Sequence, residues 1–322
     1  MAKPFLGAAC LAVMLSSTSA VAACPIVPAP RSALALDGFY ADRDGTVVDA
    51  SRREKRDRAV AVYEKVVRLV QAGADAFMTR TDRHAGQCAL RQLAAWAAAS
   101  PLTGALDGKQ AEYERNWYLA GFALAYLKLK PLADGAQSAQ IQDWLRRISD
   151  GTNAALEEGK IPGNNLSYWA GLALAAAGLA TETETLMDRA HLVLRDGLGA
   201  VSRDGTLPQE MKRGSRALSY HAFAAGPLVL LGYIAETRGE TYDKAALARL
   251  GDAILSGLDH PAAFAAAAHA DQEAPAAWNL AWLPAYRRLV STTTMPDPSR
   301  SSHFLGGDVP MTLEAIRRTS ER

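Results

Sequence analysis

The chain has 322 residues, of which 49% are hydrophobic and 21% are charged. This composition is ordinary for a globular protein, and the length is enough to bury a large core. Its 35 basic and 34 acidic side chains give a formal net charge of +1, so the overall charge gives no support for a nucleic-acid-binding protein. A local cleft can still be basic on a nearly neutral protein, and an anionic ligand therefore stays open.

The first 23 residues have the pattern of a cleaved secretory signal peptide. Lys3 gives a positive start, Phe5 to Leu15 form a short apolar run, and small residues lead up to Ala23. The run is too short to cross a bilayer, and no later apolar run is long and uninterrupted enough to do so. We therefore predict export to the periplasm, cleavage before Cys24 and no membrane span.

Two cysteines, Cys24 and Cys88, remain after Cys10 is lost with the signal peptide. Two cysteines in an oxidising compartment favour a disulfide, which would add about 4 kcal/mol by chain-entropy estimates. The alternative is a lipid on Cys24, because the V-A-A-C that begins at Val21 resembles a lipoprotein cleavage site. That segment lacks the usual leucine three residues before the cysteine, and the disulfide is the more economical interpretation.

The mature chain begins with an extended arm, C-P-I-V-P-A-P, and a polar loop from Asp37 to Asp49. From about Ser51 onward, apolar residues recur three or four positions apart, which predicts helices. No stretch has the alternation of a strand. Paired helices in this number indicate an all-α solenoid or toroid, treated as a single domain over residues 24–322. We expect helices near residues 51–78, 87–99, 111–130, 137–158, 165–179, 183–197, 208–236, 243–257, 273–290 and 310–320.

The segment G-N-N-L-S-Y-W, from Gly163 to Trp169, is dense in amide and aromatic groups. Its two asparagines could simply cap a helix, where asparagine is favoured. Amides beside aromatic rings such as Tyr168 and Trp169 also suit a sugar-binding cleft, because the rings stack on sugars and the amides bond to hydroxyls. Both interpretations stay open for Asn165.

The segment K-R-G-S-R-A-L-S-Y-H, from Lys212 to His221, brings two arginines near a tyrosine. On a helix, Arg213, Arg216 and Tyr220 would fall within about 60° of one another. A solvated basic face is the simpler interpretation. In the functional one, the guanidinium groups lower the phenol's pKa from its ordinary value of about 10, so that Tyr220 can take a proton and later return it.

A third segment, Q-A-E-Y-E-R-N-W, places Gln110, Tyr113 and Trp117 on one helix face. A mixed amide, phenol and indole face suits carbohydrate binding, and a buried stripe with satisfied polar ends is equally consistent with the spacing. Clusters with metal-ligand spacing and Gly-rich phosphate loops are not found in the sequence. No metal and no cofactor are predicted.

Together these segments resemble the periplasmic alginate lyase family, whose members depolymerise poly-β-D-mannuronate. The family's N-N-H-S-Y-W is N-N-L-S-Y-W here, and after the same interval its L-K-R-x-x-R-A-L-x-Y-H is M-K-R-G-S-R-A-L-S-Y-H. The segments G-T-L-P-Q-E, C-P-I-V-P-A-P, Q-C-A-L-R-Q-L-A-A-W-A, A-W-L-P-A-Y and L-G-G extend the resemblance over nearly all of the mature chain. It implies an incomplete (α/α) toroid with a substrate cleft, and a mobile lid loop at Asp37 to Asp49.

The resemblance also implies roles for single residues. Tyr220 would be the catalytic tyrosine, and Arg213 and Asn165 would bind and neutralise the substrate's carboxylate. Cys24 and Cys88 match a disulfide pair of the family. The further substrate-binding candidates are Gln110, Tyr113, Trp117, Tyr168, Trp169, Arg216 and His221. The implied partner is an anionic polyuronate rather than nucleic acid, and an exopolysaccharide secretion complex is a further candidate partner.

One departure from the family pattern bears on mechanism, because Leu166 stands where the family has histidine. Leucine can neither neutralise a carboxylate nor move a proton. In mannuronate and glucuronate the C5 hydrogen and the C4 oxygen lie on the same side of the ring, so Tyr220 could serve alone as base and acid. In guluronate they lie on opposite sides and two groups are needed. His221 is not expected to replace the histidine, because adjacent helix positions point about 100° apart.

Three hypotheses follow. The first is a lyase that cleaves mannuronate- or glucuronate-type polymers by syn elimination. The second is a catalytically weak or inactive polyuronate-binding protein on the same fold, which the loss of the histidine favours. The third is a toroidal glycosidase that uses two carboxylates.

Overall fold

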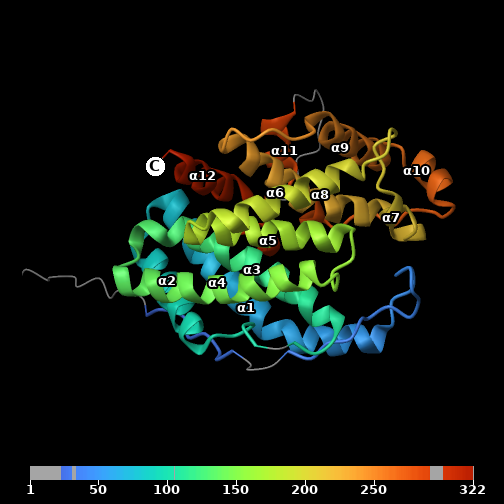
Figure 1. Ribbon diagram of the computed structural model, residues 1–322. Helices are drawn as coiled ribbons and strands as arrows, with labels where there is room; N and C mark the ends of the chain where they lie inside the picture. The colour runs from blue at the N-terminus through green and yellow to red at the C-terminus, as the bar shows by residue number, and fades with distance from the viewer. Residues whose placement is uncertain (1–22, 31–33, 105, 291–299, 322) are drawn as a thin grey trace, which may run out of the picture.

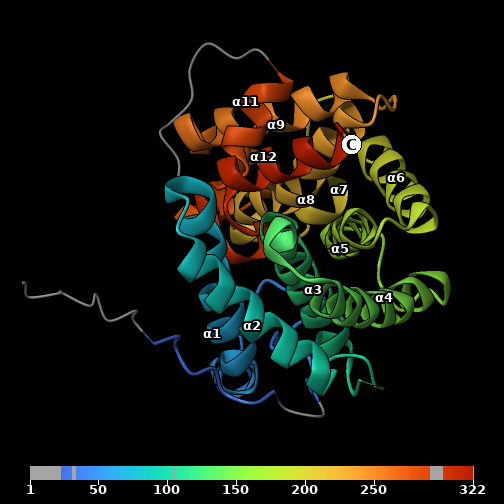
Figure 2. The same cartoon turned by 90° about the vertical axis from the view of Figure 1, so that its left-hand side faces the viewer.

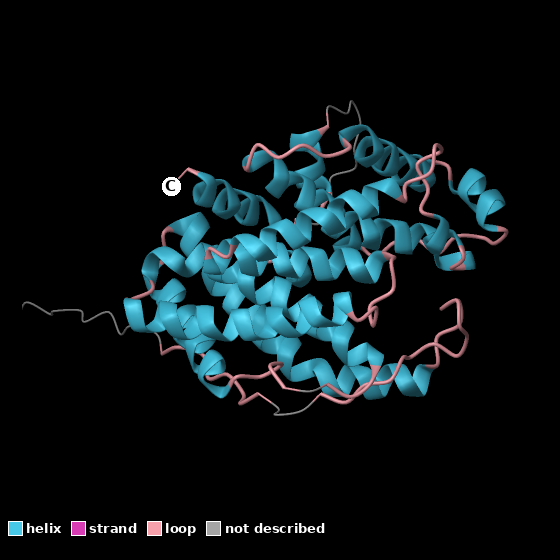
Figure 3. Cartoon of the chain, in the orientation of Figure 1, coloured by secondary structure: helices cyan, strands magenta, loops and turns pink. Residues whose placement is uncertain are grey.

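The computed structural model describes residues 23–30, 34–104, 106–290 and 300–321. Nearly all of the predicted signal peptide lies outside these residues. Helices joined by loops make up almost all of the described chain (Figures 1 and 3). The helices are α1 (Ala50–Arg80), α2 (Arg83–Ala99), α3 (Lys109–Leu129), α4 (Gly135–Glu157), α5 (Asn165–Thr181), α6 (Glu184–Gly199), α7 (Pro208–Met211), α8 (Ala217–Thr237), α9 (Lys244–Asp259), α10 (Pro261–Ala268), α11 (Leu283–Leu289) and α12 (Val309–Ser320).

Short 3-10 turns and one small hairpin complete the described elements. The turns are η1 (Lys130–Leu132), η2 (Gly214–Arg216), η3 (Ala277–Leu280) and η4 (His303–Leu305). The strands β1 (Ser301–Ser302) and β2 (Gly307–Asp308) are antiparallel, with Ser301 opposite Asp308 and Ser302 opposite Gly307. The prediction of an all-α chain is therefore confirmed for the described residues.

The helices form antiparallel hairpins that follow one another around a ring (Figure 2). The first helices of the hairpins, α1, α3, α5 and α8, pack side by side in that order. Helices α5 and α8 are apolar around almost their whole circumference and are buried almost completely, as expected for helices surrounded by others. Helix α3 is also largely buried, although it carries charged residues such as Glu114 and Lys128. Helices α4, α6 and α9 bury one face only, so they form the outside of the ring.

Helix α8, with the turn before it, is long and apolar enough to cross a membrane by length and composition alone. Of the most apolar stretch of 18 residues in this helix, 83% is buried inside the fold. This helix lies in the centre of one continuous apolar core that extends from Leu34 to Ile316. We therefore interpret it as a core helix.

Two of the predicted helices are wrong in their extent. The helix predicted over 208–236 breaks between α7 and α8, because Gly214 has a φ of +56°, in the left-handed region that interrupts a helix. The helix predicted over 273–290 is instead a loop, the turn η3 and the short helix α11. Helix α10 was not predicted; Pro261 starts it at a position where proline is favoured.

The N-terminal arm is fastened along α2. Cys24 and Cys88 form a disulfide with their Cα atoms 5.3 Å apart, so the predicted pairing is confirmed. Gln92 donates to the carbonyl of Pro25 at 2.7 Å, and Trp96 donates from its indole nitrogen to the carbonyl of Pro28 at 3.0 Å. The arm thereby leads to the loop 37–49, which lies at the end of the ring where α1 begins (Figure 1).

Candidate functional site

The candidate residues gather where α3, α5 and α8 begin. Tyr113 lies in the first turns of α3, Asn165 is the first residue of α5, and Tyr220 lies in the first turn of α8. Helix N-termini carry unpaired N–H groups and a partial positive charge. The starts of these three helices are therefore suited to an anionic ligand before any side chain is considered.

Tyr220 lies between two guanidinium groups, although the helix that was expected to align them is broken. The guanidinium carbon of Arg213 is 4.4 Å from the centre of the Tyr220 ring, and that of Arg216 is 5.2 Å away. The turn at Gly214 lets Arg213 fold back over the ring from outside α8. The predicted cluster is present, but a turn rather than a helix face produces it.

The loop 37–49 covers this tyrosine. The hydroxyl of Tyr40 makes a short contact with the hydroxyl of Tyr220. Arg216 donates to the same Tyr40 oxygen at 2.8 Å, and Arg213 donates to the carbonyl of Asp44 at 2.9 Å. Both arginines thus link the loop to the tyrosine. The loop lies where a lid would lie, and its mobility stays a prediction.

The loop has a fixed internal structure. Asp42 accepts hydrogen bonds from the backbone N–H groups of Thr46 and Val47 and from the Thr46 hydroxyl, and the two backbone bonds lower its pKa to about 2. Gly45 has a φ of +69°, and a Cβ there would collide with the guanidinium of Arg213. Glycine at this position therefore allows the loop to approach Arg213.

The pKa of Tyr220 is raised in this arrangement. Burial is the largest cause, the contact with Tyr40 adds to it, and Arg213 and Arg216 act in the opposite direction. The sequence predicted the effect of the two arginines but not the larger effect of burial under the loop. With the loop in place, Tyr220 is a neutral phenol whose hydroxyl is already occupied.

Asn164 and Asn165, at the start of α5, make different hydrogen bonds. Asn164 is a helix cap, because its side chain accepts from the backbone N–H of Leu166 at 3.0 Å. Asn165 is fully buried and donates from Nδ2 to both carboxylate oxygens of Glu210, at 2.9 and 3.0 Å. Glu210 is also 3.6 Å from Nε of Arg213. A buried acid thus joins the two residues expected to bind the substrate's carboxylate.

Glu210 is not among the residues predicted from the sequence, although it is the glutamate of the G-T-L-P-Q-E segment. Burial raises its pKa, while hydrogen bonds from Asn165 and the charge of Arg213 act against that rise. The signal available in the sequence was an acidic residue directly before the basic motif. The sequence could not show that the side chain of Glu210 points toward Asn165 at the start of α5.

Leu166 is half-buried and packs against the small apolar cluster of Ala155, Ile161 and Ala170. Its side chain supplies apolar packing between α4 and α5. Nothing in these contacts takes over the proton transfer that a histidine could perform.

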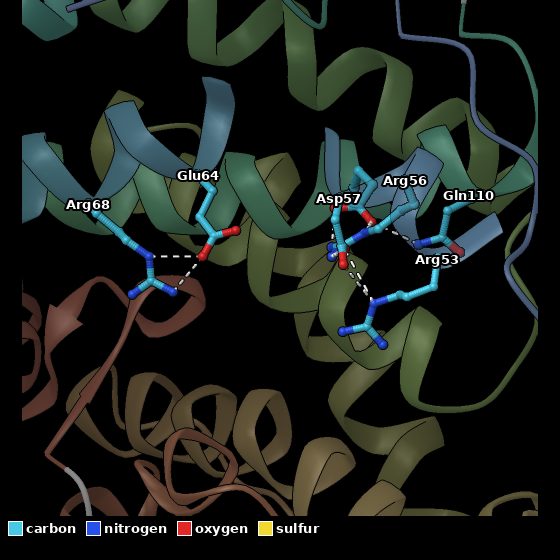
Figure 4. Close-up of polar contacts among 7 residues, drawn as sticks. Arg53, Arg56, Asp57, Glu64, Arg68 and Gln110 are labelled. Atoms are coloured by element: carbon cyan, nitrogen blue, oxygen red, sulfur yellow. Dashed lines mark hydrogen bonds and ion pairs between the residues drawn. The ribbon is translucent and has the colours of Figure 1, made fainter. Parts of the chain in front are cut away.

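The predicted face of α3 divides into separate environments. Gln110 is buried and donates to Glu114 at 2.8 Å, and Glu114 binds Arg56 of α1 (Figure 4). Tyr113 is half-buried. Burial raises the pKa of its phenol, and the charge of Arg213 acts against that rise. Trp117 is buried. Only Tyr113 of the three therefore remains beside the site in a partly exposed position.

Several aromatic candidates belong to a buried cluster next to Tyr220. The Phe223 ring is 6.3 Å from that of Tyr220 and packs against Trp117 at 5.8 Å and Trp169 at 5.0 Å, measured between ring centres. Trp278, which is not among the residues predicted from the sequence, packs on Phe223 and is 39% exposed. The cluster packs against the ring of Tyr220 through Phe223. Trp278 is the exposed member of the cluster.

Two predicted contact residues are used by the fold instead. Tyr168 is buried against Gly197. His221 is fully buried; its Nε2 accepts from the N–H of Leu207 at 2.8 Å, and its Nδ1 lies 2.7 Å from the carbonyl of Ala217. Burial lowers the His221 pKa to about 4. Both ring nitrogens are engaged, so the geometry does not support His221 as a substrate contact.

Helix α1 carries a series of ion pairs. Arg53 binds Asp57, Arg56 binds Asp57 and Glu114, and Arg68 binds Glu64 (Figure 4). Elsewhere in the described chain, the ligand atoms of Cys24, His84 and Cys88 lie within 4.8 Å of one another. The disulfide between the two cysteines occupies their sulfur atoms.

The chain is similar to known polysaccharide lyases. A family model described as alginate lyase matches residues 18–264. A polysaccharide lyase of Stenotrophomonas maltophilia (strain K279a) is 34% identical over 262 residues, covering 80% of this chain and 79% of the relative. An alginate lyase of Pseudomonas syringae pv. tomato is 38% identical over 192 residues, covering 55% of this chain and only half of the relative.

Solved structures show the same architecture. Alginate lyase A1-III from Sphingomonas species A1 has a TM-score of 0.74 at 18% identity, over 90% of this chain and 86% of that one. A variant of alginate lyase A1-III complexed with a tetrasaccharide has a TM-score of 0.78 at 18% identity, over 90% and 85%. At this identity the likeness establishes the fold, and the predicted (α/α) toroid is confirmed.

Proposed function

Because the chain belongs to the alginate lyase family, we propose that it is a polysaccharide lyase that cleaves mannuronate-type polyuronates by β-elimination. The observation that carries the proposal is the phenol of Tyr220 held between Arg213 and Arg216 at the positive ends of α5 and α8. A base and a group that binds carboxylate are the two requirements of this reaction.

The reaction follows from these groups. Arg213 and the amide of Asn165 would stabilise the negative charge that grows on the C5 carboxylate as the C5 proton leaves. Tyr220, as phenolate, takes that proton; the electron pair forms the C4–C5 double bond, and the C4–O bond breaks. The phenol then returns its proton to the departing oxygen.

Tyr40 contacts the hydroxyl of Tyr220 in this structure, and we propose that an incoming substrate displaces it. Burial and Tyr40 raise the pKa of Tyr220, whereas both arginines lower it. Moving the loop away removes the contact with Tyr40 and part of the burial, and leaves the arginines in place. We propose that this exchange ionises Tyr220 only when a uronate occupies the cleft.

The specificity rests on Leu166. Without a second proton-transfer group, one tyrosine can serve only a hydrogen and a leaving oxygen on the same face of the sugar. Mannuronate and glucuronate polymers meet this requirement, and guluronate does not. The related proposal of a weak or non-catalytic polyuronate-binding protein is favoured by the same residue, because Leu166 is committed to apolar packing.

The test is a polymer panel followed by the far-ultraviolet absorbance of the unsaturated product. The lyase proposal predicts product from polymannuronate or polyglucuronate and little from polyguluronate. Loss of the product signal in Tyr220→Phe, with binding retained, supports the assigned base. Binding without turnover by the wild type supports the non-catalytic proposal, and efficient cleavage of polyguluronate contradicts the syn mechanism.

We propose further that the protein acts in the periplasm, as a single domain beginning at Cys24. The disulfide between Cys24 and Cys88 supports export, because such bonds persist in oxidising compartments. The intact mass of the secreted protein tests this: loss of 23 residues and of two hydrogens is expected, and a lipid on Cys24 would contradict it. A role in an exopolysaccharide secretion complex stays a prediction.

A further inference from the structure

Glu210 is a buried carboxylate to which the elimination reaction assigns no task. It is fully buried on α7 and accepts from the backbone N–H of Asn165 at 2.9 Å as well as from its side chain. Arg213 is the cation beside it, with 3.6 Å between Nε and Oε2. Asn165 and Arg213, which should recognise a substrate carboxylate, therefore already lie against a carboxylate of the protein.

The orientation of the Asn165 amide is the consequence. Its Nδ2 faces Glu210, and its Oδ1 is buried without a hydrogen-bond partner. An amide presents donors on one side and an acceptor on the other. While Glu210 is ionised, it holds the donors, so the free side of Asn165 is an acceptor, which would repel an incoming carboxylate.

A protonated Glu210 would reverse this orientation. Its Oε2–H could donate to Asn165 Oδ1 after the amide makes a half-turn, while Oε1 continues to accept from the backbone N–H of Asn165. The buried acceptor would then be satisfied, and the Nδ2 donors would be free for the substrate. The exchange between Glu210 and Asn165 uses the same atoms and needs no movement of the backbone at these two residues. Because Asn165 is fully buried in this structure, the groups that cover its amide must move before a substrate can reach it.

The surrounding charges decide between the two states. Arg213 is the cation that acts on Glu210; Tyr168 of α5 is the other titratable group that interacts with it, and it is neutral because burial raises its pKa. His221, beside the start of α7, is neutral as well, because burial lowers its pKa. A uronate bound at Arg213 would place two carboxylates on one guanidinium, and such a pair in a buried site favours protonation of one of them.

We propose that Glu210 takes up one proton from solvent when a uronate carboxylate binds at Arg213, and that the protonated acid turns the Asn165 amide so that its donors face the substrate. The proton becomes the Oε2–H of Glu210, and no bond of the substrate changes in this step. Glu210 is thus a positioning residue that acts through Asn165. This inference rests on the proposed function, because it requires a uronate in the site.

The test measures proton uptake on binding. A mannuronate oligosaccharide is titrated calorimetrically into Tyr220→Phe, which removes both turnover and the titration of the phenol, in buffers of different ionisation enthalpy from pH 5 to 9. We expect uptake that approaches about one proton per site in a window above the ordinary pKa of glutamate. Within that window the association constant should fall about tenfold per pH unit, because this slope equals the number of protons taken up.

Two further substitutions in the same background separate Glu210 from other groups. Glu210→Gln should abolish the uptake and make affinity nearly independent of pH, because a glutamine amide always has an N–H to donate to Asn165 Oδ1. Glu273→Gln is the matched control. Glu273 is exposed and lies 3.8 Å from the other arginine, Arg216, so its replacement should leave the uptake unchanged.

An infrared difference spectrum of the Tyr220→Phe protein on binding gives a second readout that does not depend on folding of the Glu210 variant. A new protonated-carboxyl band supports the inference. Binding with no proton uptake between pH 5 and 9, or with equal uptake in Glu210→Gln, overturns it and leaves the proposed lyase intact. A wild type that neither binds nor cleaves mannuronate and glucuronate polymers overturns both.

Discussion

At the end of the ring where α5 and α8 begin, Arg213 and Arg216 lie against the phenol of Tyr220. At the end where α3 and α5 finish, Lys128 and Lys130 are bound by acceptors of the protein. Buried Lys128 donates to Asp75 at 2.5 Å and to the carbonyls of Gly306 and Asp308. Lys130 binds Glu182 and the carbonyl of Ala180. A cavity of about 320 Å³ opens there too, but its lysines already have partners.

The two ends differ because helix ends differ. The C-terminal ends carry partial negative charge and unpaired carbonyls, so cations there stabilise the fold. The N-terminal ends carry partial positive charge, which does not stabilise additional arginines. Arg213 and Arg216 lie 3.6 and 3.8 Å from Glu210 and Glu273, whereas Lys128 and Lys130 lie 2.5 and 2.7 Å from their acidic partners. Charge at one end therefore serves stability, and the more loosely paired charge at the other end can also bind a ligand.

The largest expected effect lies at the end without the site. Lys128→Met leaves Asp75, whose side chain is 21% exposed, without its cation, and loss of one partner of a buried ion pair costs at most about 3–5 kcal/mol. Urea unfolding should show this loss, with kcat/KM of the folded protein unchanged. Lys130→Met is the control: its partner Glu182 is 78% exposed, and such pairs contribute about 1 kcal/mol or less. Equal losses in both variants would contradict the comparison.

His221 extends the comparison to a residue next to the catalytic candidate. Burial lowers its pKa from 6.5 to about 4. Between these two pH values the imidazole is protonated in the unfolded chain but neutral in the folded protein. The stabilisation is complete above pH 6.5 and is lost as the pH falls toward 4, by roughly 3 kcal/mol at most.

The free energy of unfolding, measured at steps from pH 7.5 to 4, should fall less steeply in His221→Asn than in the wild type. His303, whose pKa burial also lowers to about 4, keeps part of the slope in both proteins. An unchanged slope would mean that His221 is not buried in its neutral form.

Arg213→Lys should reverse the pattern of Lys128→Met. Lysine keeps the charge but cannot hold Asp44, Glu210 and a substrate carboxylate with one planar group. We expect kcat/KM to fall roughly 10- to 100-fold, the range for loss of a charged hydrogen bond, with little change in stability. Arg238→Lys, which replaces an arginine paired with Glu184 and Glu240 at the opposite end, should leave kcat/KM unchanged.

The smallest effect tests the loop. Gly45→Ala places a methyl group against the guanidinium of Arg213 and strains a φ of +69°, which costs about 1 kcal/mol. A fall in kcat/KM of about fivefold is expected. Gly38→Ala, where a Cβ meets nothing within 4 Å, should leave activity and melting temperature as they are. A similar loss in both variants would show that loop stiffness, rather than the position of Arg213, matters.

The fold could be predicted well because its signals are local. Apolar spacing located the hairpins, and side chains that cap helices, such as Asp82, Asp134 and Asp243, mark where new helices begin. The helix over 208–236 failed because the left-handed φ of Gly214 cannot be read from glycine alone. Glycine also occurs within helices of this chain, for example Gly171 in α5.

The site could be predicted only in part. The spacing predicted that Arg213 and Tyr220 lie near each other, and the resemblance to the family implied their roles, although a turn brings them together. Tyr40 is 180 residues away from Tyr220 in the chain, and nothing local indicates their contact. The contact between Glu210 and Asn165 depends on how α7 lies against α5. Burial, which governs the pKa of Tyr220, is likewise a property of the assembled fold.

The most direct test of the central claim is the initial rate of unsaturated product formation from polymannuronate, compared between the wild type and Tyr220→Phe. Loss of a general acid and base predicts a fall of roughly 10²- to 10⁴-fold in kcat, with binding of the polymer retained. A Tyr220→Phe enzyme that cleaves polymannuronate at the wild-type rate would contradict the account.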